Sequence, residues 1–217
     1  MTIASQVRDL RQAGPSPLPP EVVQTFAAEQ QALRSATDRS GFVAVGDVLE
    51  PFALADPAGR TVSLDDLLAA GPTVLVFYRG AWCPYCNITL ATYRRELAPA
   101  LRERGVTLAA ISPQQPDGSL TMQEKHDLDF PVLSDADKAL AGRLGIVIHP
   151  TAEVSAAQRS LGLDLTAVNG QDAPSLPMPT VLVVDRDRTV RFADVHPDYT
   201  ERTEVQAILD AVDALRD

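Results

Sequence analysis

Cysteine, aromatic side chains and positive charge are all scarce in this sequence. Only 2 of the 217 residues are cysteines, which excludes a framework of several disulfide bridges. Aromatic residues make up 5%, and 29 acidic residues outnumber 19 basic ones, for a formal net charge of -10. This balance argues against nucleic acid as a partner, because polyanions select for clustered lysine and arginine.

Long apolar runs are missing too. The first residues contain no stretch of signal-peptide length, and no later stretch approaches the length that spans a bilayer. We therefore expect a soluble, cytoplasmic protein without a membrane partner. The hydrophobic content of 45% is enough for one domain with a sizeable core and a modest appendage.

Residues 1–40 differ in pattern from the rest of the chain. A polar, helix-like opening is followed by the proline-rich stretch "GPSPLPP" and then by a segment with apolar residues at helical spacing. These apolar residues are Val22, Val23, Phe26, Ala27 and Leu33. We predict an N-terminal helical arm and linker over 1–40, used for packing or for a dimer contact, and a main domain over 41–217.

After Gly41, short apolar runs alternate with helix-like segments. The expected strands cover 52–55, 60–63, 73–78, 106–112, 130–135, 180–185 and 189–195. Helices are expected over 64–70, 84–103, 119–128, 136–145 and 201–217, with Pro99 interrupting the second and a polar insertion over 151–176. This alternation predicts an α/β fold with parallel central strands and an antiparallel final pair.

The two cysteines lie together in "YRGAWCPYC", at the end of the buried-strand pattern "TVLVFY". At the start of a helix, unpaired amides and the helix dipole stabilise a thiolate, which favours Cys83 as the nucleophile. Pro84 suits the first helical position. Cys86 lies one turn further on, close enough to attack a mixed disulfide or a sulfenic acid on Cys83. The pair is interpreted as a dithiol redox centre.

Other uses of the pair fit the sequence less well. Zinc needs two more ligands, and the three histidines, His126, His149 and His196, are scattered singly. A cysteine-protease nucleophile does not need a second cysteine at this spacing. Two inert buried cysteines are a poor explanation for a strand-to-helix junction, and so small a disulfide loop adds little stability. The histidines are interpreted as structural or solvated.

Three stretches resemble the peroxiredoxin-like branch of the alkyl hydroperoxide reductase and thiol-specific antioxidant family, in the thioredoxin superfamily. They are "FYRGAWCPYC", "LSDADKALAGRLG" and "MPTVLVVDRDRTVRFADV". The resemblance runs from about Val45 to the C-terminus. It implies a thioredoxin-like fold, a central mixed sheet flanked by helices, here preceded by the N-terminal arm.

The resemblance also points to "MPT" near the closing hairpin. Pro179, between Met178 and Thr180, is similar to the cis-proline that faces the redox pair in this superfamily. A cis bond before Pro179 is plausible because X-Pro bonds carry a small cis penalty. The alternative is an ordinary proline that begins a strand.

The sequence departs from the peroxiredoxin pattern at three positions. The alignment puts Cys86 at the family's peroxidatic cysteine, which favours Cys86 as the attacking sulfur where helix position favours Cys83. Arg79 stands where the pattern has proline, and Cys83 where it has threonine or serine. Met178 lies near the place of the family's arginine. Because of these departures, efficient peroxide reduction is only one of several activities to be expected.

Other residues near the pair are candidates for support. The Arg79 guanidinium can favour a thiolate, although a solvated loop arginine is as good an interpretation. The resemblance suggests that Arg202 approaches the site, with surface placement as the alternative. Trp82 and Tyr85 are expected to form an apolar rim for an organic peroxide or a partner's cysteine, or simply to pack.

Local signals add two smaller expectations. Phe77 stands six residues before Cys83, where thioredoxins carry an acidic proton relay, so a general base must come from elsewhere or from water. Ser63 has the form of a helix cap, and Asp135 and Asp137 are expected to cap the helix after "LSD".

The expected activity is that of an antioxidant oxidoreductase. A Cys83/Cys86 dithiol-disulfide cycle would reduce a hydroperoxide, with thioredoxin or glutathione as reductant and with no cofactor or metal. A thioredoxin-like disulfide reductase or isomerase acting on proteins is the first alternative, and a non-catalytic redox sensor the second. A homodimer is suggested by the resemblance and the arm.

Overall fold

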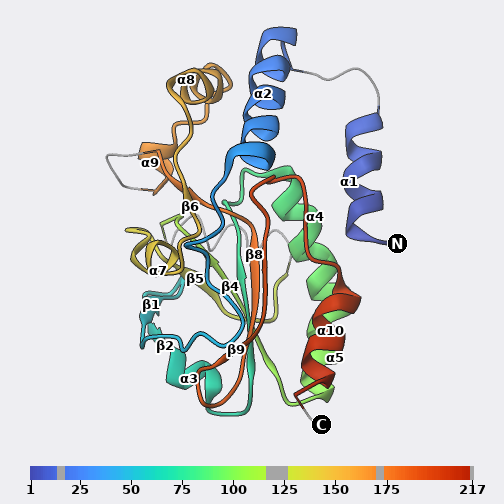
Figure 1. Ribbon diagram of the computed structural model, residues 1–217, viewed down its shortest axis with the longest axis vertical. Helices are drawn as coiled ribbons and strands as arrows, with labels where there is room; N and C mark the ends of the chain where they lie inside the picture. The colour runs from blue at the N-terminus through green and yellow to red at the C-terminus, as the bar shows by residue number, and fades with distance from the viewer. Residues whose placement is uncertain (14–17, 116–126, 170–173, 216–217) are drawn as a thin grey trace.

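The computed structural model describes residues 1–13, 18–115, 127–169 and 174–215. Seven strands form one sheet in the order β2-β1-β5-β4-β3-β8-β9, with helices on both faces (Figure 1). These strands are β1 (Ala53–Ala55), β2 (Thr61–Ser63), β3 (Thr73–Phe77), β4 (Thr107–Ser112), β5 (Val132–Ser134), β8 (Thr180–Val184) and β9 (Val190–Val195). A separate pair joins β6 (Val147–Ile148) to β7 (Leu176–Pro177).

The sheet is mixed. Strands β3, β4 and β5 are parallel, whereas β8 is antiparallel to β3, β9 to β8, and β1 to both β2 and β5. This arrangement confirms the parallel centre and the antiparallel closing hairpin predicted from the sequence, as well as the thioredoxin-like fold class.

The helices are distributed around this sheet (Figure 1). They are α1 (Ile3–Gln12), α2 (Pro20–Ala36), α3 (Leu64–Leu68), α4 (Pro84–Thr92), η1 (Tyr93–Leu97), α5 (Ala98–Glu103), α7 (Ala139–Arg143), α8 (Ala152–Ser160), α9 (Leu165–Asn169) and α10 (Val205–Asp213). Within the described ranges, none of them combines the length and the apolar character that a bilayer span requires.

The central strands are apolar throughout because alternate residues enter two different cores. On β3, Val74 and Val76 join the core beneath α1, α4 and α10, while Leu75 and Phe77 join the core on the other face with α3 and α7. Strands β4 and β8 alternate in the same way. Both sulfurs belong to the first core.

Pro99 interrupts the helix after the dithiol, as the sequence predicts. The interruption takes the form of a π-helical turn, η1, in which the Ala98 N–H donates to the Tyr93 carbonyl. The wider turn accommodates a proline that cannot donate a backbone hydrogen bond of its own. Helix α5 then continues to Glu103.

Two predicted helix starts are confirmed, and the predicted polar insertion contains two helices. Ser63 and Asp66 form a reciprocal capping box at α3. The Asp135 carboxylate accepts from the Leu140 and Ala141 N–H groups, and Asp137 accepts from Ala139. The polar insertion expected over 151–176 contains α8 and α9, which bury the apolar residues Val154 and Leu165. The helix expected over 119–128, with His126, lies mostly outside the described residues.

The arm predicted over 1–40 contains α1 and α2, and both contact the rest of the chain. Helix α1 packs on α4, with Ile3 and Val7 buried in the first core. The Glu204 carboxylate accepts from the Ile3 and Ala4 N–H groups, at 2.9 and 2.8 Å, and so caps α1 from a distant part of the sequence. The division into an arm over 1–40 and a domain over 41–217 stays a prediction.

Candidate active site

The cysteines follow a tight turn between β3 and α4. Gly80 has φ +148°, and a Cβ atom at this position would collide with the Trp82 ring. The Ala81 N–H donates to Gln114 Oε1 at 2.8 Å, which ties the turn to the end of β4. Glycine is therefore required here, and the turn delivers the chain to the helix start at Cys83.

Both cysteines are free thiols, and both are buried. Cys83 is the N-cap residue of α4 and Pro84 its first helical residue, as predicted. The exposed fraction is 1% for Cys83 and 0% for Cys86. The two thiols lie close enough to shift each other's pKa, with Cys83 as the hydrogen-bond donor and Cys86 as the acceptor.

Arg202 reaches the Cys86 sulfur. Its Nη1 donates to the carbonyl oxygens of Tyr199 and Glu201, each at 2.5 Å, and its Nη2 lies 3.4 Å from Cys86 Sγ. The two carbonyl groups fix one side of a planar guanidinium, which leaves the other side directed at the sulfur. The surface alternative for Arg202 is therefore wrong.

The two sulfurs titrate in opposite directions. Burial alone would raise the pKa of Cys86, but the hydrogen bond from Cys83, the Arg202 charge and the backbone N–H of Arg79 lower it to about 5. Burial raises the pKa of Cys83, and the neighbouring Cys86 sulfur raises it further. Helix position favoured Cys83 as the thiolate, yet Cys86 collects the donors, so the first proton leaves Cys86.

Arg79 is buried, with 4% exposed, so the solvated interpretation is wrong. Its Cζ lies 3.9 Å from the Tyr199 ring centroid and 5.0 Å from that of Trp82. A guanidinium between two aromatic faces is stabilised by cation–π attraction. Its charge also helps to lower the pKa of Cys86. The Arg79 guanidinium thus lowers the pKa of Cys86 through its charge, while the Arg79 backbone N–H lowers it by hydrogen bonding.

Trp82 and Tyr85 are half-buried beside the sulfurs. Trp82 packs against both cores, and its indole Nε1 is buried without a hydrogen-bond partner among the described residues. The Tyr85 ring centroid lies 6.5 Å from that of Tyr199. These rings pack beside the buried dithiol, which is compatible with an apolar rim and equally with simple packing.

The predicted cis bond before Pro179 is wrong, because the described residues contain no cis peptide. The Met178 N–H donates to the Ile146 carbonyl at 2.7 Å, and the Pro179 carbonyl accepts from the His196 N–H at 2.9 Å. These bonds hold an extended chain on both sides, where the trans form is intrinsically preferred. Pro179 and Thr180 line a small cavity with Cys86, whereas Met178 packs in the second core.

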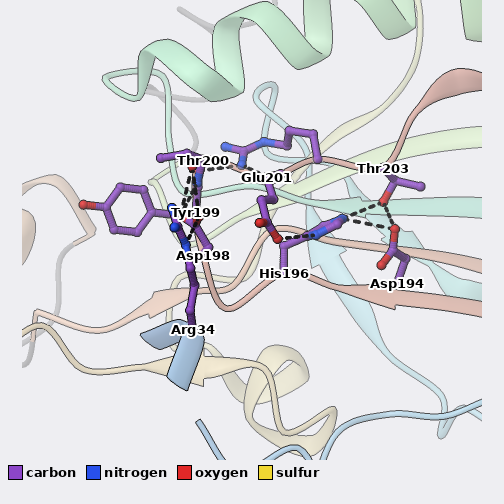
Figure 2. A network of polar contacts seen from close by, with 9 residues as sticks. Arg34, Asp194, His196, Asp198, Tyr199, Thr200, Glu201 and Thr203 are labelled. Atoms are coloured by element: carbon purple, nitrogen blue, oxygen red, sulfur yellow. Dashed lines mark hydrogen bonds and ion pairs between the residues drawn. The ribbon is translucent and has the colours of Figure 1, made fainter. Parts of the chain in front are cut away.

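A polar network joins the end of β9 to the segment that follows it (Figure 2). His196 Nε2 lies 3.1 Å from Asp194 Oδ2 and 3.3 Å from Thr203 Oγ1, with Glu201 on its other side. The Tyr93 hydroxyl donates to the Thr203 carbonyl at 2.6 Å. Segment 196–203 is therefore fixed at several points. Sequence spacing suggested no partner for His196, although Asp194 lies two residues before it.

Helix α2 contacts segment 196–203 through two of its side chains. Arg34 pairs with Asp198 at 2.5 Å (Figure 2). Gln30 Nε2 donates to the Tyr199 hydroxyl at 3.2 Å. Burial raises the pKa of Glu29, and the nearby Arg79 charge opposes the rise. Sequence reasoning found no chemistry in this helix, because its partners lie about 165 residues away.

The cavity at Cys86 is small. Its volume is about 10 Å³, and its lining includes Thr89, Tyr93 and Arg202. This is marginal even for one water molecule. Within the described part of the chain, no three His, Cys, Asp or Glu side chains gather into a group that could hold a metal ion. The site is thus a buried dithiol with two adjacent guanidinium groups.

Comparison with known sequences finds relatives of two kinds. Peroxiredoxin Bcp of Escherichia coli strain K12 is 33% identical over 102 residues, which are 46% of this chain and 64% of that protein. Thiol-disulfide oxidoreductase ResA of Bacillus anthracis is 29% identical over 108 residues, 49% of this chain and 61% of that protein. The chain therefore spans just under two thirds of the length of these curated relatives.

Solved structures give longer matches. Peroxidoxin BcpB from Mycobacterium tuberculosis superposes with a TM-score of 0.63 at 25% identity, covering 81% of this chain and 99% of that one. A peroxiredoxin-like protein from Aquifex aeolicus has the same TM-score at 15% identity, with 80% and 88% covered. At that identity the second match shows the fold alone.

The sequence model of the AhpC/TSA family matches residues 45–193. The match includes β3, the dithiol turn and the closing hairpin of β8 and most of β9, and it covers more than half of the chain. Its limits exclude α1 and α2 on one side and Arg202 on the other. The resemblance inferred from the three sequence stretches is confirmed, and the chain belongs to the AhpC/TSA family.

Proposed function

We propose that this protein is a thiol peroxidase, an antioxidant oxidoreductase in which Cys86 attacks a hydroperoxide and Cys83 resolves the product. One observation carries the proposal. The Cys86 sulfur accepts hydrogen bonds from the Cys83 thiol, from Arg202 Nη2 and from the Arg79 N–H. This set of donors stabilises a thiolate at neutral pH. Family membership and the peroxiredoxin relatives support it.

The reaction has three steps. The Cys86 thiolate attacks the O–O bond of ROOH, an oxygen is transferred to sulfur, and the alcohol ROH leaves with a proton from solvent. The Cys83 thiol then attacks the sulfenic acid, and a disulfide and water form. A dithiol reductant such as thioredoxin, or two molecules of glutathione, returns two electrons and two protons. Arg202 binds the developing negative charge on the peroxide oxygen.

The reductant and the setting are part of the proposal. A dithiol that cycles needs a compartment that supplies reduced thiols, which points to the cytoplasm. A homodimer is included on the strength of the family resemblance. Neither metal nor organic cofactor is needed, because sulfur carries both electrons.

Stopped-flow oxidation by hydrogen peroxide tests the assignment with two variants. Cys86→Ser should abolish the fast reaction, because it removes the attacking thiolate. Cys83→Ser should keep the first oxidation and accumulate a sulfenic acid that a dimedone probe traps. Sulfenic acid formed only in Cys86→Ser would reverse the assignment, and oxidation no faster than that of free cysteine would refute the peroxidase.

A disulfide reductase acting on proteins is the second candidate, favoured by the similarity to a thiol-disulfide oxidoreductase. Burial argues against it. A protein disulfide must reach a sulfur, yet the two cysteines are 1% and 0% exposed, and the less buried one has the raised pKa. A hydroperoxide group is far smaller. Turnover of insulin disulfides at a rate above that of hydrogen peroxide would favour this candidate.

A further inference from the structure

One carboxyl group of the N-terminal arm is buried close to the residues that surround the dithiol. Glu29 lies on α2 next to Gln30, and its Oε2 atom is buried with no hydrogen-bond partner among the described residues. A buried carboxylate oxygen that accepts no hydrogen bond is costly to keep ionised. Burial accordingly raises the pKa of Glu29, against the opposing effects of the Arg79 charge and the Tyr199 hydroxyl.

Arg79 links this carboxyl to the reactive sulfur. Its guanidinium lies over the Tyr199 ring, with Cζ 3.9 Å from the ring centroid. The hydroxyl of the same tyrosine is close enough to Glu29 to lower its pKa as a hydrogen-bond donor. The Arg79 charge also lowers the pKa of Cys86. Arg79 is thus attracted to two groups that can each be negative, the Cys86 sulfur and the Glu29 carboxyl.

The Arg79 charge has no direct ion pair in the part of the chain that the structure describes. The side chain is 4% exposed, and its Nε is buried there without a hydrogen-bond partner. A buried charge needs a counter-charge nearby, because burial removes its stabilisation by water. The Cys86 thiolate supplies that counter-charge in the reduced protein, and disulfide formation removes it.

The other charged or titratable groups around this part of α2 are engaged, exposed or neutral. Arg34 pairs with Asp198. Burial raises the pKa of Tyr199, so its hydroxyl stays protonated near neutral pH. Helix α8 packs against α2, and its charged residues are both exposed: Glu153 and Arg159. Glu29 is therefore the carboxyl that is placed to respond when the thiolate near Arg79 disappears.

We propose that Glu29 balances the charge of the dithiol site: it holds a proton while Cys86 is a thiolate and releases that proton when the disulfide forms. The inference rests on the proposed Cys83/Cys86 cycle. Glu29 acts through Arg79, so it is a positioning residue for charge and not a catalytic one. It precedes the stretch 45–193 that matches the family, so this role belongs to the N-terminal arm.

The proposal fixes the proton balance of oxidation. Without a responding group, the Cys86 thiolate, the Cys83 thiol and hydrogen peroxide give the disulfide, water and hydroxide, which amounts to the uptake of one proton from solvent. If Glu29 releases its proton, the hydroxide becomes a second water and the net uptake is zero. Reduction reverses both changes, because the two electrons from the reductant arrive with two protons, one for Cys83 and one for Glu29.

Proton uptake per disulfide, measured with a pH indicator in weakly buffered solution between pH 6 and 8, tests this balance. The wild type should show a minimum of about half a proton or less, because Glu29 is protonated in one redox state and ionised in the other. Glu29→Gln should take up close to one proton at every pH, since an amide cannot release one. Glu29→Asp keeps a carboxyl and should keep the minimum.

Glu21→Gln is the matched control, because it removes an exposed carboxyl from the same helix. Its proton uptake should equal that of the wild type. An equal minimum in Glu29→Gln would assign the proton to another group and overturn the proposal. Uptake of one proton by the wild type at every pH would overturn it as well, whether or not any variant folds.

The thiolate absorbance of Cys86 gives a second readout. Glutamine imitates the neutral acid, so Glu29→Gln should leave the pH profile of this absorbance unchanged. If Glu29 is instead a permanent anion beside Arg79, its removal strengthens the effect of Arg79 on the sulfur. The profile then shifts to lower pH while proton uptake stays the same in both proteins, and the proposal is wrong.

Oxidation by diamide separates this inference from the peroxidase on which it rests. Diamide oxidises a dithiol without an O–O bond: its N=N group gains one hydrogen from the Cys83 thiol and one proton from solvent. The same proton counts are therefore expected. Failure of hydrogen peroxide to oxidise the wild type would refute the peroxidase, whereas the diamide counts would still test Glu29. A normal peroxide reaction with no minimum for either oxidant would refute the role of Glu29 alone.

Discussion

The dithiol turn, residues 78–86, and the segment after β9, residues 196–203, meet at one sulfur atom but are built in different ways. The turn is set by backbone geometry: a glycine with positive φ, a proline at the helix start and an N-cap cysteine. The later segment is held by side chains from β9, η1 and α2. The turn thus positions the sulfur, and the later segment supplies its charge.

The difference teaches that reactivity at Cys86 can be lost while the dithiol stays intact. Arg202 donates to the sulfur only because the Tyr199 and Glu201 carbonyls orient its guanidinium. Those carbonyls keep their positions through contacts far from the sulfur. Variants of the two segments should therefore separate thiolate position from thiolate stability.

The largest effect is expected when the charge from the later segment is removed. Arg202→Met deletes the charge-assisted hydrogen bond to Cys86 and the donor to the peroxide, each worth about 1.5–3 kcal/mol. Oxidation by hydrogen peroxide at pH 7 should slow by about 10- to 100-fold or more, since ~1.4 kcal/mol is a factor of ten. Stopped-flow fluorescence of the lone Trp82 can follow the reaction.

Two variants control that measurement. Arg79→Met removes a charge that lies over the Tyr199 ring, and it should slow oxidation less than Arg202→Met does. Arg191→Met removes an exposed arginine that pairs with Asp185 and Asp187, and it should leave the rate unchanged. A larger loss in Arg79→Met than in Arg202→Met would assign the decisive charge to the turn.

A smaller effect is expected from the turn itself, measured as a pH profile. The pKa of Cys86 is lowered to about 5, so its thiolate is nearly complete at pH 7 and is lost as the pH falls through 5. Cys83→Ala removes the thiol that donates to Cys86, and should raise its pKa by about 1–2 units, as expected for one hydrogen bond to a charged group. The rate of the first oxidation then declines at a higher pH.

Cys83→Ser is the matched variant, because its hydroxyl can still donate. Its profile should remain closer to that of the wild type than the profile of Cys83→Ala. The thiolate absorbance near 240 nm, followed against pH, gives the pKa without any turnover. Identical profiles for all three proteins would mean that the turn contributes position only, and that the later segment alone lowers the pKa.

Sequence reasoning recovered the first of these regions better than the second. The dithiol turn could be predicted because strand, turn and helix signals follow one another within about fifteen residues. The parallel central strands and the closing hairpin follow from the same local patterns. The expectation of a cis bond before Pro179 was wrong. Backbone hydrogen bonds with Ile146 and His196 hold this stretch of the chain, and local sequence does not report them.

The network around Arg202 could not be derived from local pattern. The relevant pairs join residues such as Arg34 and Asp198, which are 164 positions apart, and spacing says nothing about such contacts. The resemblance suggested that Arg202 approaches the site, but not that α2 supports it. The choice between Cys83, favoured by helix position, and Cys86, favoured by the alignment, was open for a related reason: burial and the neighbouring sulfur raise the pKa of Cys83, and neither can be read from local sequence.

The smallest effect on the oxidation rate is expected from the contacts between α2 and residues 198–199. Arg34→Ala leaves Asp198, whose side chain is 1% exposed, with only its bonds to Thr200, and should cost about 1–3 kcal/mol of unfolding free energy. Oxidation should slow by less than tenfold, because Arg202 keeps its carbonyl contacts but loses part of their support.

The matched control for that variant is Arg60→Ala, which also removes an arginine from a buried aspartate, Asp56, at 7% exposed. This pair lies in the β1–β2 turn, and its loss should lower stability without changing the rate. Urea unfolding and stopped-flow oxidation of both variants separate the two effects. If Arg34→Ala loses stability but oxidises at the wild-type rate, the contact between α2 and Asp198 does not affect the position of Arg202. The N-terminal arm then stabilises the fold without tuning the sulfur.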